Sequence, residues 1–304
     1  MAQVVLLTTI QLSLMILLGF VLGKAGYLTR ERSEFLSALV LDVFFPCATV
    51  AAAGSDTGGG SVWPVIGLCF ALLFLFTAAA YPAAKLLGLD RDHTLVFTRS
   101  AAFPNNGFMG LPLCAAVFGE RGALWAALTV PGTSLYLFSM ILLSFGRREE
   151  QKQGVRKYLT PLNLSVVAML VMIAAKWSLP PVLQSVCSSM AACTTPAAML
   201  SIGYLLSASP LLDTLRQPSL YVVTLLRNLA FPLLTAALLR LTGWNRELCL
   251  SLVMTLGCSV GSVVSIAAAH NHRAEGYAGQ SMLQSTLLLP VTMPLMMFFA
   301  DKIL

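Results

Sequence analysis

The chain has 304 residues, of which 57% are hydrophobic and 11% are charged, with a mean hydropathy of +0.81. A soluble globular domain is typically about a quarter charged, so this composition excludes that class and indicates a protein embedded in a lipid bilayer. The formal net charge of +6 would suit nucleic acid in a soluble protein, but here the basic residues report membrane topology and no nucleic-acid partner is expected.

Ten apolar segments are long enough to cross a bilayer, which predicts an all-α polytopic membrane protein. The first has no basic residue before it, so we interpret it as a retained span and not as a signal peptide. The ten predicted spans cover approximately residues 4–22, 35–53, 62–87, 93–118, 123–145, 159–177, 182–207, 220–239, 247–270 and 277–300.

A basic linker, residues 146–160, separates two sets of five predicted spans, residues 1–145 and 161–304. If this linker is cytoplasmic, twelve basic residues lie in the loops and helix ends on that side and five on the other. This distribution satisfies the positive-inside rule. It predicts a multi-pass protein of the plasma (inner) membrane with both termini outside.

An odd number of spans in each half forces the second half into the opposite orientation, as in the inverted repeats of many secondary transporters. The sequence supports such a repeat, because Pro46 and Pro196 are 150 residues apart and so are Pro82 and Pro232. Residues next to these prolines also match between the halves.

The fourth predicted span contains the sequence FPNNGFMGLPL, in which prolines, amides and glycines interrupt an apolar helix. Proline disrupts the helical hydrogen bonds, so we expect this span to unwind near its middle. The matching ninth span has no proline, and only its small residues indicate a break. Two broken helices would offer free N–H groups to an anion, whereas the alternative is a passive kink with close glycine packing. The candidate binding residues are Pro104, Asn105, Asn106, Gly107, Ser259, Gly261 and Ser262.

The run from Pro104 to Leu113 resembles a segment of the auxin efflux carrier superfamily, which includes the plant PIN-FORMED proteins and bacterial members described as malate or malonate carriers. The stretches 22–46, 226–234 and 284–298 are also similar to that family, in the same order. The family pattern often has a proline in the ninth helix, where this chain has Ser259.

The resemblance implies a fold like that of sodium/proton antiporters and bile-acid symporters, with two inverted five-helix repeats and broken helices 4 and 9 that cross. It further implies a scaffold of helices 1, 2, 6 and 7, often a homodimer, and a moving transport part. By the same likeness, Pro104 is the first proline of the crossing and Asn105 faces the substrate carboxylate.

Three ionisable residues, Asp42, Arg99 and Arg227, lie well inside predicted spans at a similar depth of roughly 10 Å. Because a lone charge there is costly, Asp42 is expected to pair with Arg99 or Arg227. If that pair forms and breaks during transport, Asp42 would carry a coupling proton. In the structural alternative, Arg99 reaches toward water, Arg227 caps a helix and Asp42 forms a static pair. In a third interpretation an arginine binds the substrate carboxylate. Ser134 and Tyr136 in the fifth span are further candidates for the pocket.

These features predict a secondary transporter of a small organic anion, a mono- or dicarboxylate, that works by alternating access and uses a proton or sodium ion for coupling. A ligand-binding sensor with a transporter-like core is the alternative, and a channel is disfavoured because no ring of polar residues defines a pore. The spans contain no catalytic set of side chains, so an enzyme is not expected. The seven cysteines show no metal-ligand spacing and are interpreted as apolar fillers, without metal or cofactor.

Overall fold

The computed structural model describes residues 2–53, 62–140, 161–208 and 211–304. Throughout these residues the chain is helical, apart from turns, short extended segments and one isolated β-bridge. The all-α prediction is therefore confirmed. The predicted linker, residues 146–160, and the loop of residues 54–61 lie outside the described residues.

Among the described helices of the first half are two π-helical turns, η1 and η2, which are wider than an α-helical turn. Their bounds are α1 Ala2–Lys24, α2 Arg30–Leu39, η1 Val40–Phe44, α3 Phe45–Ala52, α4 Val62–Leu86, α5 Arg91–Ala102, η2 Asn106–Gly110 and α6 Leu111–Met140.

The second half contains one further π-helical turn. Its elements are α7 Pro161–Ala175, α8 Pro181–Ala192, α9 Thr194–Ala208, α10 Leu211–Leu215, α11 Pro218–Leu225, η6 Leu226–Ala230, α12 Phe231–Leu239, α13 Arg246–Leu256, α14 Ser262–His270 and α15 Glu275–Ile303.

Each π-helical turn ends two residues before a proline, namely Pro46, Pro112 or Pro232. A proline has no N–H to donate, and its ring clashes with the carbonyl four residues earlier. The helix accommodates the ring by widening. The N–H of the residue that precedes each proline donates to the carbonyl five residues earlier in the chain, as in a π-helix. Proline positions therefore set these local distortions, and η1, η2 and η6 carry Asp42, Asn106 and Arg227 respectively.

Seven helices in the described part of the chain are long and apolar enough to cross a membrane, which fits a multi-pass membrane protein. Fewer are found than the ten spans predicted, because interruptions leave α5, α13 and α14 with 12, 11 and 9 residues. In addition, residues 141–160, which contain parts of the predicted fifth and sixth spans, are not among the described ones. The count of ten stays a prediction.

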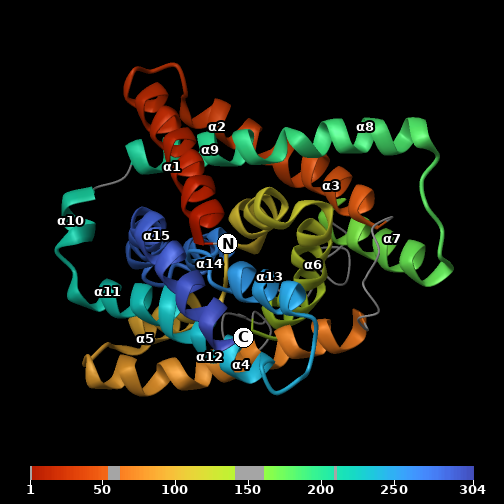
Figure 1. The fold of residues 1–304 in the computed structure, drawn as a ribbon. Coiled ribbons are helices and arrows are strands. Elements are labelled where there is room, and N and C mark those ends of the chain that lie inside the picture. Colours follow the sequence, from red (N-terminus) through yellow and green to blue (C-terminus); the bar gives the residue numbers. More distant parts are fainter. Residues whose placement is uncertain (1, 54–61, 141–160, 209–210) are drawn as a thin grey trace.

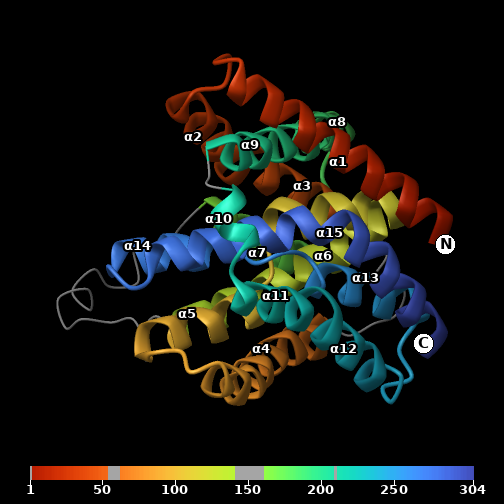
Figure 2. The same cartoon turned by 90° about the vertical axis from the view of Figure 1, so that its left-hand side faces the viewer.

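The helices pack in two groups. The first group consists of α1, α2, η1, α3, α7, α8 and α9, and the second of α4, α5, η2, α6 and α11 to α15. Figure 2 shows α1, α2, α3, α8 and α9 gathered on one side of the molecule, and α4, α5, α11 and α12 on the opposite side. The N- and C-terminal ends lie at the same edge in that view.

Within the first group, α1 and α9 pack closely against each other where they cross (Figure 1). The contact depends on two glycines: a Cβ on Gly19 would collide with the backbone of Leu200, and one on Gly203 with the backbone of Ile16. Lipid supplies little hydrophobic drive for helix association, so such backbone proximity is a usual way to hold membrane helices together.

Candidate functional site

The helical hydrogen bonding of the fourth predicted span stops at Ala102, where α5 ends. Phe103 is extended, with φ −92° and ψ 114°, and Asn105 has φ −83° and ψ 58° before η2 begins. Steric clash with a following proline ring disfavours helix at the preceding residue, so Pro104 explains why the break starts at Phe103. The predicted interruption around Asn105 is confirmed.

The ninth predicted span is also interrupted, although it contains no proline. Helix α13 ends at Leu256, and α14 begins only at Ser262. Glycine explains the intervening segment: a Cβ on Gly261 would lie 2.6 Å from the ring of Phe103 and 2.8 Å from the carbonyl oxygen of Pro104. Only a residue without a side chain lets the two broken segments approach this closely.

The two interrupted segments run antiparallel against each other and form a β-bridge between Pro104 and Val260. The amide of Asn105 donates to the carbonyl of Ser259 at 2.8 Å, and the amide of Gly261 donates to that of Phe103 at 3.0 Å. These bonds satisfy backbone groups that the broken helices leave open. The C-terminal ends of α5 and α13 and the N-terminal ends of η2 and α14 consequently lie around one short bridge.

The two adjacent asparagines have different environments. Asn106 donates from Nδ2 to the hydroxyls of Thr129 and Thr133, at 3.1 and 3.0 Å, and so fixes η2 against α6. Asn105 is 4% exposed, and its Nδ2 has no hydrogen-bond partner among the described residues. The amino group of Asn106 is therefore bonded to α6, whereas that of Asn105 is buried without a described partner, which is costly.

Arg227 is 0% exposed and connects η6 to both interrupted segments. Its Nη1 donates to the carbonyl of Ala102 at 2.6 Å and to that of Ala101 at 3.3 Å, and its Nε donates to that of Cys258 at 3.2 Å. Arg227 thus caps the C-terminal end of α5, where carbonyls carry partial negative charge, which was one of the alternatives for this residue. Its Nη2 has no partner within the described part of the chain.

Asp42 lies apart from this arrangement, whereas Arg99 lies on α5 one turn before Phe103. Asp42 is exposed on η1 in the first group of helices, and no described ion pair joins it to Arg99 or Arg227, which belong to the second group. Arg99 is half-buried and donates to the hydroxyl of Thr98 at 3.3 Å. The expected pairing of Asp42 is therefore not seen, because similar depth along helices does not bring side chains on different faces together.

Among the other candidates, Ser259 belongs to the bridge segment and Tyr136 lies beside it. Tyr136 is buried, bonds the hydroxyl of Thr77 and stacks with Phe103 at a centroid distance of 6.1 Å. The hydroxyl of Ser259 donates to the sulfur of Met109 at 3.1 Å. Ser134 and Ser262 are half-buried, and a Cβ on Gly107 would meet only Phe45, at 3.7 Å.

Residues of α15 that sequence reasoning did not select also reach this region. Ser285 accepts a hydrogen bond from the amide of Val260 at 3.0 Å, and its carbonyl accepts from Nδ2 of Asn228 at 2.9 Å. The neighbouring Gln284 is 0% exposed, and neither atom of its amide has a partner among the described residues. The sequence signal was the polar triplet Gln284 to Thr286 inside an otherwise apolar span.

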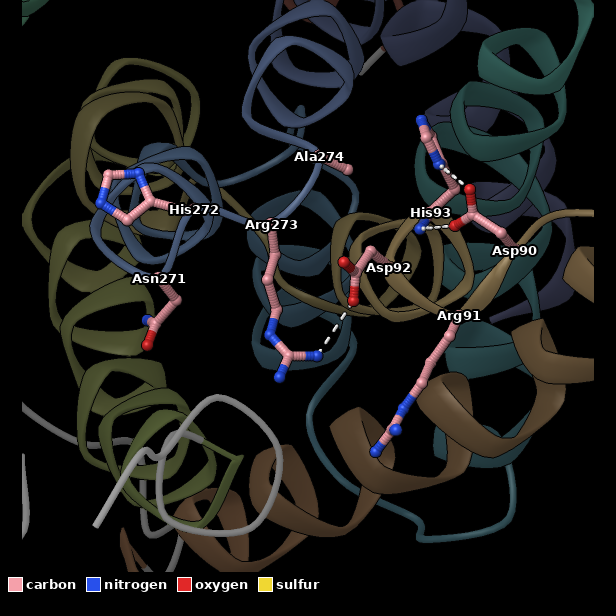
Figure 3. A pocket seen from close by; sticks show the side chains of 8 residues that line it. All are labelled: Asp90, Arg91, Asp92, His93, Asn271, His272, Arg273 and Ala274. Atoms are coloured by element: carbon pink, nitrogen blue, oxygen red, sulfur yellow. Dashed lines mark hydrogen bonds and ion pairs between the residues drawn. The ribbon is translucent and has the colours of Figure 1, made fainter.

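A polar hollow of about 610 Å³ lies at the other end of α5, against the turn between α14 and α15 (Figure 3). Arg273 bonds Asp92 across it at 3.0 Å, joining residues 181 positions apart. Asp90 caps α5 by accepting from the amide of His93 at 2.8 Å, and this bond lowers the pKa of its carboxyl group. The hollow is lined by Asp90, Arg91, Asp92, His93, Asn271, His272, Arg273 and Ala274.

Comparison with known proteins gives two findings. The model of a family described as membrane transport protein matches residues 4–154. Over 301 residues the chain is 27% identical to a protein of Methanothermobacter thermautotrophicus described as an uncharacterized transporter, and the match covers 95% of this chain and 96% of that protein.

Proposed function

Since the chain belongs to the membrane transport protein family, the auxin efflux carrier family, we propose that it is a secondary transporter of a small organic anion, a mono- or dicarboxylate. The family is one of membrane transporters and not of enzymes. The observation that carries the anion assignment is the position of Arg227, a fully buried cation at the bridge between the two interrupted segments.

The charges around the bridge favour a negatively charged ligand. Arg227 already compensates the partial negative charge at the C-terminal end of α5, whereas the N-terminal ends of η2 and α14 contribute partial positive charge. Nη2 of Arg227 and Nδ2 of Asn105 are donors without partners among the described residues. A carboxylate accepts hydrogen bonds from such donors and matches the sign of the charge. We therefore place the substrate at Asn105 and Arg227, with Gln284 as a further polar contact.

We further propose ten transmembrane helices arranged as two inverted repeats, residues 1–145 and 161–304, that cross at the bridge. Two neighbouring pairs support this arrangement, because α1 packs against α9 and α3 packs against α7. The first pair joins predicted spans 1 and 7, and the second joins predicted spans 2 and 6. The repeat relates span 1 to span 6 and span 2 to span 7, so each pair is the counterpart of the other. The first group of helices would be the scaffold of a homodimer, and the second group the part that moves.

In this proposal the second group carries the bridge between the two sides of the membrane, so that the site opens to each side in turn. The protein would lie in the plasma membrane with both termini outside and the linker, residues 146–160, in the cytoplasm. A coupling proton or sodium ion remains part of the hypothesis.

The test is uptake of radiolabelled mono- and dicarboxylates by purified protein in liposomes, after a thermal-shift screen has selected the ligands. We expect uptake by the wild type and at least a tenfold lower rate for the double variant Pro104→Ala, Asn105→Ala. A matched control is Ser189→Ala on α8, whose hydroxyl donates to the carbonyl of Ser185 on the same helix. Equal uptake by the double variant and the control would reject the site, and a ligand that stabilises the protein without crossing the membrane would favour a sensor.

A further inference from the structure

Cys47 and Cys187 lie on two helices that pack against each other, although they belong to opposite halves of the sequence. Cys47 is on α3 and Cys187 is on α8, and both are free and partly exposed. Sequence patterns gave no reason to pair them, because no short spacing links these positions.

The packing of α3 against α8 places these two cysteines opposite each other. The two helices are neighbours and run in opposite directions, as Figure 1 shows. Nε2 of Gln184 donates to the carbonyl of Ala51 at 3.0 Å, which fixes the register between them. Gln184 lies about one turn before Cys187 and Ala51 about one turn after Cys47, so the next contact along the antiparallel pair is the one between the two thiols.

The other cysteines differ from this pair in burial or in surroundings. Cys69, Cys114, Cys249 and Cys258 are buried, and the thiols of Cys114 and Cys258 lie beside helix carbonyls at 3.4 Å. Cys193 is exposed, and its thiol lies 3.7 Å from the carbonyl of Ser189 on its own helix. Partial exposure and a neighbouring cysteine are two of the features that reversible oxidation sites share.

We propose that Cys47 and Cys187 are a dithiol site that a hydroperoxide oxidises to a disulfide, which joins the two halves of the chain. In the first step one thiol is oxidised to a sulfenic acid, and the hydroperoxide is reduced to the corresponding alcohol. In the second step the other thiol attacks that sulfur, forms the S–S bond and releases water. Two thiols thereby lose two protons and two electrons, and one hydroperoxide accepts them.

The setting of the pair favours an apolar hydroperoxide, such as one formed on a lipid chain. Cys47 lies on the predicted second span and Cys187 on the predicted seventh, about 8 Å from the ends of these helices. Both belong to the first group of helices, away from the bridge between Pro104 and Val260. The disulfide would therefore fix α3 against α8 without entering the proposed substrate site, and the inference does not depend on the identity of the substrate.

The experiment places a site-specific protease sequence in the linker, after Gly154, of the otherwise complete protein in liposomes. Samples are treated with cumene hydroperoxide, blocked with N-ethylmaleimide, cleaved and separated by electrophoresis with and without dithiothreitol. We expect most of the oxidised wild type to migrate at full length without dithiothreitol and as two halves with it. Cys47→Ser and Cys187→Ser should give two halves in both lanes, and Cys193→Ser should behave as the wild type.

Mass spectrometry of the cleaved, unreduced wild type identifies the linked peptides and should find Cys47 joined to Cys187. The inference is overturned if the oxidised wild type separates without reductant. It is equally overturned if the link contains Cys193 or survives in the Cys47→Ser variant. The wild-type lanes alone can decide against it, so a variant that folds poorly does not leave the question open.

Discussion

Nη1 of Arg227 lies 2.6 Å from the carbonyl oxygen of Ala102, the last residue of α5 before the chain becomes extended. A side chain from η6 thereby satisfies the end of a helix from the other half of the sequence. The same guanidinium bonds Cys258, just after α13 ends, so one cation stabilises both interruptions. Backbone carbonyls thus take the place of a carboxylate partner for this buried cation, and in our proposal the anionic substrate binds beside it.

We predict that Arg227→Met abolishes anion binding and lowers stability. The substitution keeps the volume of the side chain but leaves three carbonyls without their donor, at a cost of about 1–3 kcal/mol for each group left unsatisfied. Arg227→Lys retains the charge but not the fork geometry, so we expect intermediate stability and weak binding. Thermal unfolding with and without the carboxylate checks both effects.

The control for this prediction is Arg240→Met, because Arg240 is an exposed residue on the same helical segment of the second half. Its removal costs one exposed hydrogen bond to the carbonyl of Ile303, so it should lower the melting temperature little and leave the shift produced by ligand unchanged. If Arg227→Met retains the full ligand-induced shift, Arg227 only supports the structure and does not contact the substrate.

Exchange of the two asparagines for alanine should separate stability from binding. Asn106→Ala removes the bonds to Thr129 and Thr133 and should destabilise the protein by about 1–3 kcal/mol. Asn105→Ala removes a donor without a described partner, so we expect little loss of stability but a weaker ligand-induced shift. Each variant is the control for the other. If Asn105→Ala lowers stability and Asn106→Ala weakens the ligand-induced shift, Asn106 and not Asn105 contacts the ligand.

Much of this arrangement follows from local sequence signals. Pro104 alone predicts the end of α5, since the clash between a proline ring and the residue before it needs no tertiary information. The apolar composition likewise predicts an all-α membrane protein, because lipid cannot satisfy exposed backbone groups. The break in the ninth span was less visible, because Gly261 is required by the ring of Phe103, which is far away in the sequence.

The roles of individual polar residues could not be read from the sequence in the same way. Asn105 and Asn106 are chemically identical, and only the hydroxyls of Thr129 and Thr133 distinguish them. Depth along a helix placed Asp42 and Arg227 at one level, but it did not show that their helices belong to different groups. Such differences depend on the direction in which each side chain points, which is set by packing.

Gly261→Ala should destabilise the bridge because the new methyl group would overlap the ring of Phe103 and the carbonyl of Pro104. Overpacking of this kind costs about 1–3 kcal/mol, and we expect a lower melting temperature together with weaker ligand binding. Gly279→Ala on α15 is the matched control, because a Cβ there meets nothing within 4 Å. An unchanged melting temperature for Gly261→Ala would mean that the two interrupted segments lie farther apart than described.

Acidification should remove the contribution of the Asp90 cap at the start of α5. The amide of His93, followed by its ring, binds the carboxylate and lowers the pKa of Asp90 below its usual range. A carboxyl group whose pKa is lower in the folded protein stabilises it above the unfolded pKa, about 3.9, and the contribution is lost as the pH falls through the folded pKa.

Asp90→Ser keeps a capping oxygen but carries no charge. We therefore expect the melting temperature of the wild type to exceed that of Asp90→Ser near neutral pH, and the difference to shrink below about pH 4. Melting curves of both proteins from pH 7 to pH 3 measure this difference, and other carboxylates affect the two proteins equally. A difference that is constant over this range would show that the charge of Asp90 does not stabilise α5.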